Sequence, residues 1–513
     1  MFNNPSPTCF LEKNVTLIFP FSSDHEAHHM HKPPRYCPHV RAAFSAFVLL
    51  LFLSPLISAY KPSTGTKATI DPATRAPSRN RATPTTPVRN SKPNPLATLF
   101  EVYTRGSGDN AGVASDSPEE IRLRKERQYT LITGLPLKPY FERRTVRRQI
   151  AKDIWTFEQP QGFFNVTTPI RMTVIRLSDG RLWVHAPVAA TAECRRLVDE
   201  LGGQVAYIVL PTTAFEHKVF VGGFARAYPA AKVYACPGQW SWPINLPPPF
   251  RVDAYLTDPR ASSDGNKGKG GGTAQTPWAN EIEHMVFEPP CIGIGPANEV
   301  VFLHKASRTL LVTDLVVYID GDSPSPVVEV PDLLKASWDD PDAVPPGAPL
   351  PPDTPANRRK GWARMALQIL FLGPTRFSTF KLVQRRLLVS PVIETFVYSK
   401  IPDALVDFVD RIATTWDFTT VLPAHFNAPA PGSPTALQDA FAFAYRLTGR
   451  RPSPARRMAG GTEGRGSNPF LALWDKVMEG AREGKRTEEY PEDDTAVLRF
   501  VNGFILKAGI ANK

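Results

Sequence analysis

A regular alternation of short apolar runs and helical stretches between residues 172 and 235 constrains the fold of this chain most strongly. The turn Ser178-Asp179-Gly180 separates the first two apolar runs, which predicts a β-hairpin. Thr191 then stands where a helix N-cap is expected. The expected strands cover 172–177, 181–186, 205–210 and 232–235, and the expected helices cover 192–201 and 220–228. Strand, helix, strand, helix, strand is typical of a layered α/β domain.

The second half of the chain adds another hairpin and more helices. Residues 299–304 and 308–313 flank a short polar turn and predict the hairpin. Helices are expected over 359–371, over 403–414 and after Thr435, with a strand over 419–423. This pattern predicts one α/β domain without internal repeats.

Composition separates one foldable domain from several low-complexity segments. The 513 residues include 53 prolines, while 42% hydrophobic residues supply enough material for one large core. The expected order is an N-terminal extension with a signal peptide (1–59), a transit-peptide-like segment (60–95), a lead-in region (96–150), the α/β domain (151–449), and a linker with C-terminal helices (450–513). Inside the domain, a disordered insertion is expected near 258–276 and a proline-rich loop at 341–356.

The net charge of +11 does not indicate a protein that binds nucleic acid. The basic residues cluster in 61–92 and 450–465, which lack the interleaved aromatic residues of a nucleic-acid interface. Three widely spaced cysteines follow the expected presequence, Cys194, Cys236 and Cys291. Their spacing matches no CxxC site and favours a reducing compartment without a disulfide framework.

The N-terminal segments predict a targeting sequence. Residues 42–59 are apolar, follow Arg41 and end in Ser58-Ala59, as a signal peptide with its cleavage site does. A single membrane anchor over the same residues is the alternative. Residues 60–95 have the Ser, Thr, Pro and Arg content of a transit peptide. The two segments resemble the plastid presequence of algae with secondary plastids, which implies a plastid protein without stable membrane association. The alternative is an endomembrane or membrane-anchored protein.

Ionisable residues follow three of the expected strands. They are Glu216-His217-Lys218 after the third strand, Asp314 after the second hairpin and His425 after the last strand. Open α/β sheets build their sites where strands end, so we expect these side chains to lie close together. Carboxylates and imidazoles are ligands for zinc, iron and manganese, which makes this group a candidate metal site.

The order of these residues resembles the metallo-β-lactamase family, which takes metal ligands from successive loops along one sheet edge. That family carries an HxHxDH motif, a His in a GHTPGS-like turn, and then an Asp and a His that each end a strand. The residues at its first metal position are replaced here, by Thr212, Ala214 and Ile294. Donor side chains remain around its second metal position, Glu216, His217, Asp314 and His425. The resemblance implies an αββα sandwich with at most one metal ion.

Two functional hypotheses follow from this half-retained site. In the first, Lys218 pairs with Glu216 or Asp314 in place of a metal, and the degenerate fold binds a small-molecule or protein ligand without dinuclear metal catalysis. In the second, the four donor residues hold one iron, zinc or manganese ion and act as a mononuclear hydrolase or oxidoreductase. In either case Trp240 and Trp242 are candidates for the mouth of a pocket.

Several longer phrases resemble a narrower group, the plant and algal plastid proteins known as domain of unknown function 4336. The phrases lie at 155–159, 169–174, 209–212, 216–220, 239–243, 307–314 and 422–426. This resemblance implies the metallo-β-lactamase-like fold, but it does not imply a particular reaction.

Overall fold

The computed structural model describes residues 117–129, 142–163, 166–239, 250–259, 276–292, 295–339, 347–373, 377–455 and 490–509, with the single residues 248, 344 and 345. The expected targeting segments (1–95), most of the insertion near 258–276, and the residues Trp240, Trp242 and Ile294 lie outside these ranges. Within the described ranges, none of the helices has both the length and the apolar character needed to span a membrane.

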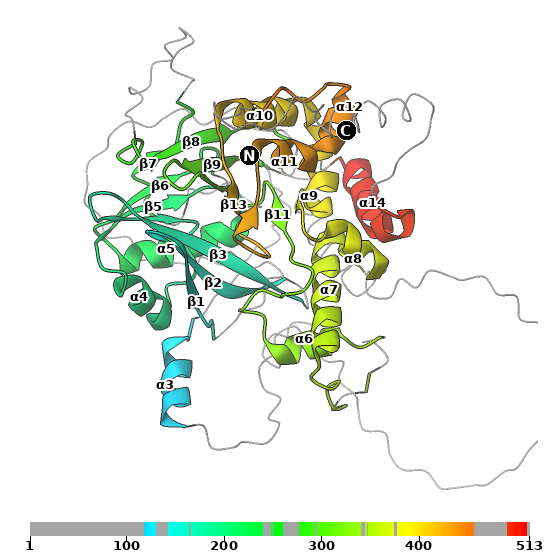
Figure 1. Ribbon diagram of the computed structural model, residues 1–513, viewed down its shortest axis with the longest axis horizontal. Helices are drawn as coiled ribbons and strands as arrows, with labels where there is room; N and C mark the ends of the chain where they lie inside the picture. The colour runs from blue at the N-terminus through cyan, green and yellow to red at the C-terminus, as the bar shows by residue number, and fades with distance from the viewer. Residues whose placement is uncertain are drawn as a thin grey trace, which may run out of the picture. The chain divides into compact units, whose positions relative to one another are not determined.

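Seven strands form the first sheet, in the order β1 to β7 (Figure 1). They are β1 (Val146–Ala151), β2 (Ile154–Phe163), β3 (Val166–Arg176), β4 (Leu182–His185), β5 (Val205–Leu210), β6 (Lys232–Ala235) and β7 (Ala254–Tyr255). Hairpins join β2 to β3 and β3 to β4, so these strands are antiparallel. The helices α4 (Ala192–Asp199) and α5 (Phe215–Ala227) connect β4, β5 and β6, which are parallel. Both helices pack their apolar side chains on the outer face of the sheet.

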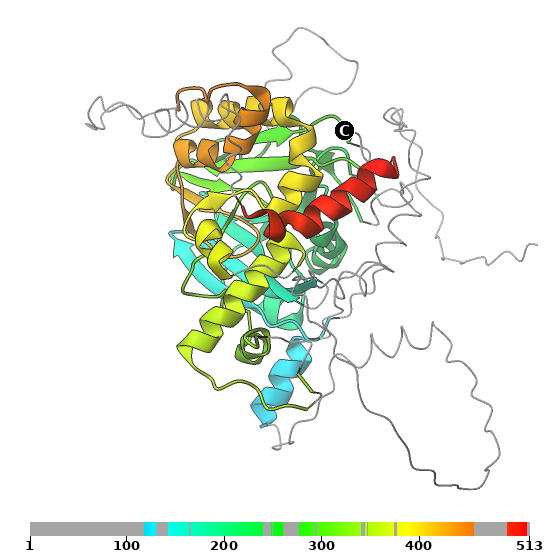
Figure 2. The ribbon, with the colours of Figure 1, turned by 90° about the vertical axis from the view of Figure 1, so that its right-hand side faces the viewer.

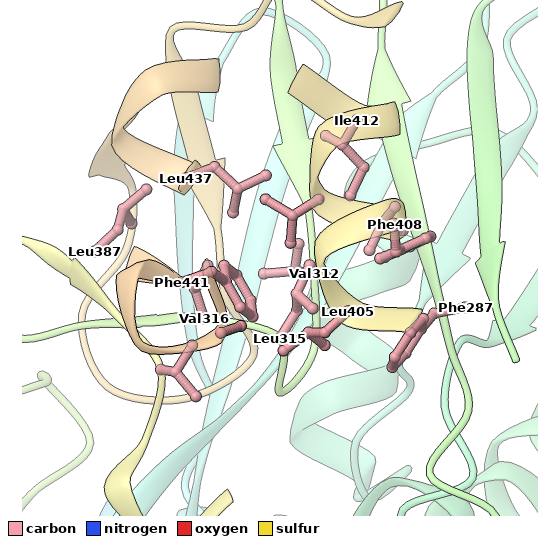
Figure 3. Close-up of a cluster of buried hydrophobic side chains, with 14 of the residues drawn as sticks. Phe287, Val312, Leu315, Val316, Leu387, Leu405, Phe408, Ile412, Leu437 and Phe441 are labelled. Carbon is pink, nitrogen blue, oxygen red and sulfur yellow. The ribbon is translucent and has the colours of Figure 1, made fainter. Parts of the chain in front are cut away.

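Five strands form the second sheet, in the order β14-β13-β10-β9-β8. They are β8 (Ile282–Phe287), β9 (Glu299–His304), β10 (Thr309–Leu311), β13 (Thr420–Leu422) and β14 (Ala430–Pro431). Three helices cover its outer face, α10 (Pro402–Thr415), α11 (Pro434–Ala440) and α12 (Ala442–Thr448). Figure 3 shows this layer, in which Leu405, Phe408 and Ile412 of α10 point toward Val312 and Phe287.

The inner faces of the two sheets pack against each other through a layer of buried aromatic residues. Trp183 of β4 is fully buried and lies 5.2 Å from Phe302 of β9, measured between ring centroids, in an edge-to-face arrangement. Trp278 contacts Trp183 and Tyr207 in the same way. Helices, sheet, sheet and helices therefore form four layers, and the prediction of an αββα sandwich is confirmed.

A further group of helices packs beside the sandwich. It comprises α6 (Val330–Ala336), α7 (Pro355–Phe371), α8 (Phe377–Val383), α9 (Pro391–Phe396), the 3-10 helix η3 (Tyr398–Lys400) and the C-terminal α14 (Glu492–Lys507), together with the strands β11 (Val317–Tyr318) and β12 (Leu387–Leu388). In Figure 2, α14 is the red helix that crosses α7 and α9, and its Leu498 is buried against that group. The helix α3 (Pro118–Glu126), near the start of the described residues, contacts α4.

Both predicted hairpins are confirmed, as β3–β4 and β9–β10. The first sheet begins at Val146, inside the segment expected to lead into the domain, because β1 pairs with β2. The predicted start of the second helix at residue 220 is wrong, since α5 begins at Phe215. Ala214 has extended backbone, and its N–H donates to the Thr212 hydroxyl, so the chain turns into the helix within four residues of β5.

Candidate metal centre

The candidate ligands approach one place from three elements. Glu216 and His217 lie in the first turn of α5 rather than in a loop, Asp314 follows β10, and His425 follows β13. The strands β10 and β13 are parallel neighbours, so the residues that follow them emerge at the same edge of the sheet. The structure brings all four residues together, with one donor atom of each within 4.8 Å of the others.

Asp314 lies at the centre of this cluster. Its Oδ1 is 3.3 Å from Nε2 of His425, and its Oδ2 is 3.9 Å from Nε2 of His217. The two imidazole rings are 5.2 Å apart between centroids. The His217 side chain is fully buried, whereas the side chains of Asp314 and His425 are 21% and 13% exposed. Asp314 and His425 therefore form the more exposed side of the cluster.

Among the residues that the structure describes, His217 has no hydrogen-bond partner for either ring nitrogen, although both atoms are buried. An unpaired buried polar group costs about 1–3 kcal/mol, so such groups call for an explanation such as a bound ion or water. The cluster supplies one, because an ion bonded to Nε2 of His217 would pair that atom. Nitrogen and oxygen donors bound to one ion at about 2.0–2.2 Å lie roughly 3 to 4.4 Å apart, so the four side chains would need to move only slightly closer together to hold an ion.

Two contacts fix the direction of the ligands. His425 has its Nδ1 3.0 Å from the carbonyl oxygen of Pro169, which leaves Nε2 to face Asp314. Glu299, at the start of β9, accepts hydrogen bonds from the backbone N–H groups of Thr313 (2.6 Å) and Asp314 (3.2 Å). The sequence analysis did not identify Glu299. Its position as the one acid at the start of an apolar strand could have indicated a functional role.

Electrostatics favour the metal-binding protonation states of His217 and Asp314 but oppose that of Glu216. Burial lowers the pKa of His217 to about 4, so its imidazole is neutral at pH 7. Burial opposes the ionisation of Asp314, yet its hydrogen bond with His425 and the two imidazoles hold its pKa below the ordinary value. Burial and the nearby Asp314 raise the pKa of Glu216, and a cation between the two carboxylates would relieve their repulsion.

The positions that diverge from the metallo-β-lactamase pattern have structural roles. Thr212 is buried and its hydroxyl accepts the N–H of Ala214, and its backbone forms a bridge with Glu299. Lys218 is also buried, and burial lowers its pKa to about 8, against the opposing influence of Cys236 and Glu216. The positive charge of Lys218 therefore lowers the pKa of Glu216, whereas His425 and His217 lower the pKa of Asp314.

Residues 151–384 and 375–443 match the model of the family described as Domain of unknown function (DUF4336). The chain belongs to the DUF4336 family. Asp314 lies inside the first matched segment of this DUF4336 protein and His425 inside the second, so the cluster falls wholly within the family's domain. Among curated proteins, no sequence matches the chain.

Solved structures similar to this DUF4336 protein include several metallo-β-lactamases. The enzyme from Hirschia baltica is 10% identical with a TM-score of 0.28, and the match covers 58% of this chain and 97% of that one. A metallo-β-lactamase from Pseudomonas aeruginosa, solved in a mono-zinc form, is 10% identical with a TM-score of 0.29 and coverages of 60% and 95%. A metal-soaked flavodiiron core from Synechocystis is 9% identical with a TM-score of 0.33 and coverages of 60% and 61%.

Proposed function

We propose that this protein binds one divalent metal ion through Glu216, His217, Asp314 and His425 and acts as a mononuclear metal-dependent hydrolase of a small molecule. The observation that carries the proposal is the fully buried His217, whose Nε2 has no hydrogen-bond partner among the described residues but lies beside three other donor side chains. Two nitrogens and up to four carboxylate oxygens suit zinc, iron or manganese, and the oxygen share favours iron and manganese.

The four residues of the cluster would have different roles in such a site. When bound, the ion would act as a Lewis acid on an oxygen of the substrate. His217 holds its neutral ring away from water, and His425 is held by Pro169 with its Nε2 toward the centre. Glu216, whose pKa is raised by burial and by Asp314, would release its proton on binding the ion, so metal affinity should increase with pH. Thr212, Ala214 and Ile294 replace the ligands of the first metal position, so the proposed site holds one ion and not two.

A metal-free ligand-binding protein is the second candidate, and the contact between Asp314 and His425 favours it. Their 3.3 Å separation forms an ion pair that needs no metal, because Asp314 raises the pKa of His425 above its ordinary value despite burial. The exposed edge of this pair would then bind a small-molecule or protein ligand, with Lys218 supplying a further positive charge beside Glu216.

Metal analysis of protein purified without chelators separates these candidates. We expect close to one equivalent of iron, zinc or manganese, lost in the double variant Asp314→Ala His425→Ala. The matched control is Asp258→Ala His284→Ala, which removes another Asp and His whose contacts include Arg411, the Val286 N–H and the Thr257 carbonyl oxygen. If the wild-type protein contains no metal, even after incubation with each ion, the metal site is refuted and the metal-free ligand-binding function is supported.

We also infer that the targeting segments deliver the protein to a plastid, on the composition of residues 42–59 and 60–95. A reporter fused to residues 30–100 tests this in a diatom-like host. Plastid fluorescence supports the inference, and retention in the endoplasmic reticulum or secretion contradicts it.

A further inference from the structure

A buried ion pair lies behind the loop that carries His425. Glu158 of β2 and Arg171 of β3 are directly opposite each other in the ladder, and their side chains are 0% and 1% exposed. Nε of Arg171 lies 3.2 Å from Oε1 of Glu158. Two further groups donate to the same carboxylate, the guanidinium of Arg148 and the hydroxyl of Ser325, the latter at 2.7 Å.

The free end of Arg171 contacts the backbone of the His425 loop. Its Nη1 donates to the carbonyl oxygens of Pro423 and, at 3.5 Å, His425, and its Nη2 donates to the carbonyl oxygen of Phe426. Arg148 extends the contact by donating to the carbonyl oxygen of Ala428 at 2.8 Å. Arg148 and Arg171 of the first sheet therefore bind backbone carbonyl groups in the loop that joins β13 to β14 of the second sheet.

An ion pair is unusual in the buried position that Glu158 and Arg171 occupy. Burying a guanidinium and a carboxylate is unfavourable unless each is paired, and apolar residues of similar size often stabilise a core as well. The loop accounts for the buried charges, because the carbonyl groups of Pro423, Phe426 and Ala428 need donors and receive them from the two guanidinium groups. A guanidinium offers several N–H groups in one rigid plane, which an ammonium does not.

The same loop is fixed on its other side. The N–H of Ala424 donates to the carbonyl oxygen of Thr313, next to Asp314, and the N–H of Asn427 donates to Tyr318. On the side of Arg171, its neighbour Ile170 on β3 also forms a backbone bridge with His425. Any displacement of the loop away from Arg171 would therefore move the His425 ring relative to Asp314.

We propose that Arg171, held in place by Glu158, is a positioning residue that fixes the backbone of residues 423–428 and so sets where His425 faces Asp314. The part of this proposal that concerns metal affinity rests on the proposed function, whereas the part that concerns the loop does not. Arg171 contacts no reacting atom, because its partners are backbone carbonyl groups and Glu158.

Hydrogen exchange followed by mass spectrometry tests the loop directly, with Arg171→Lys and the milder Ser325→Ala. We expect exchange in peptides that cover 423–428 to rise at least about tenfold in Arg171→Lys and a few-fold in Ser325→Ala, with β4 and β5 unchanged. The matched control is Arg176→Lys on the same strand, whose guanidinium donates to Leu201 instead. Unchanged exchange in 423–428, or an equal rise across the whole domain, overturns the proposal.

Cobalt titration supplies a second readout that a purely structural role would not move. If the wild type binds Co²⁺, Arg171→Lys should weaken the binding by about 10- to 100-fold and alter the visible absorption bands, while Arg176→Lys should not. Wild-type affinity and bands in Arg171→Lys would overturn the link to His425. A wild type that binds no cobalt, zinc, iron or manganese refutes the proposed metal site, and the exchange result still decides the role of Arg171.

Discussion

Replacing His217 with leucine should stabilise the metal-free protein while abolishing metal binding. The imidazole is fully buried and neutral at pH 7, and neither nitrogen has a hydrogen-bond partner in the described part of the chain. Leucine has a similar volume and no polar atom, so it removes a desolvation cost of about 1–3 kcal/mol and adds at most ~1.5 kcal/mol of repacking. We expect a net gain of roughly 1 kcal/mol in the free energy of unfolding.

Urea unfolding at pH 7.5 with a chelator present measures this change as a shift of the midpoint at constant slope. The control is His284→Leu, because His284 is also buried but has its Nε2 3.0 Å from the carbonyl oxygen of Thr257. Loss of that bond should destabilise the protein by about 1 kcal/mol. If His217→Leu is destabilised as much as His284→Leu, the ring of His217 has partners in the metal-free protein and the reasoning fails.

Three further predictions concern pH, the support of Asp314 and the core. Because burial lowers the pKa of His217 from 6.5 to about 4, the unfolded chain binds more protons between these values. Metal-free stability should therefore rise with pH across this window, by up to roughly 3 kcal/mol from His217 alone, and urea unfolding at pH 4.5 and 7 should show a flatter rise in His217→Leu. Glu299→Gln should weaken metal binding by about 10- to 100-fold without unfolding the protein, and a competition titration that finds unchanged affinity would contradict this role. Trp183→Ala should cost about 3–5 kcal/mol in urea unfolding, whereas Phe500→Ala, at a side chain that is 67% exposed, should stay within ~0.5 kcal/mol.

The sequence predicts those parts of the fold whose signals are local. Ser178-Asp179-Gly180 specifies its hairpin, and Thr191 caps α4 through the N–H of Cys194 as expected. The strand β2 escaped detection because it contains Pro160 and the buried polar side chain of Glu158, which break the apolar pattern of a core strand. Partners from elsewhere in the chain satisfy Glu158, so its burial is a property of the tertiary structure.

The four candidate ligands were predictable for a similar reason. Each follows or opens an element with a clear local pattern, and the resemblance to a known arrangement supplied their order. The residues that support them were not predictable. Arg171 reaches Pro423 across 252 positions of sequence, and Glu299 reaches Asp314 across 15, through contacts that only the packed sheets create. The start of α5 was also misplaced, although this did not change which residues meet.

A crystal structure with anomalous diffraction recorded at the zinc, iron and manganese edges tests the metal site most directly. We expect one anomalous peak among Glu216, His217, Asp314 and His425, with donor atoms at about 2.0–2.3 Å from it. The same map should place Arg171 against the carbonyl groups of Pro423 and Phe426. The absence of a peak after soaking with each ion, with Asp314 and His425 still in contact, would contradict the metal site.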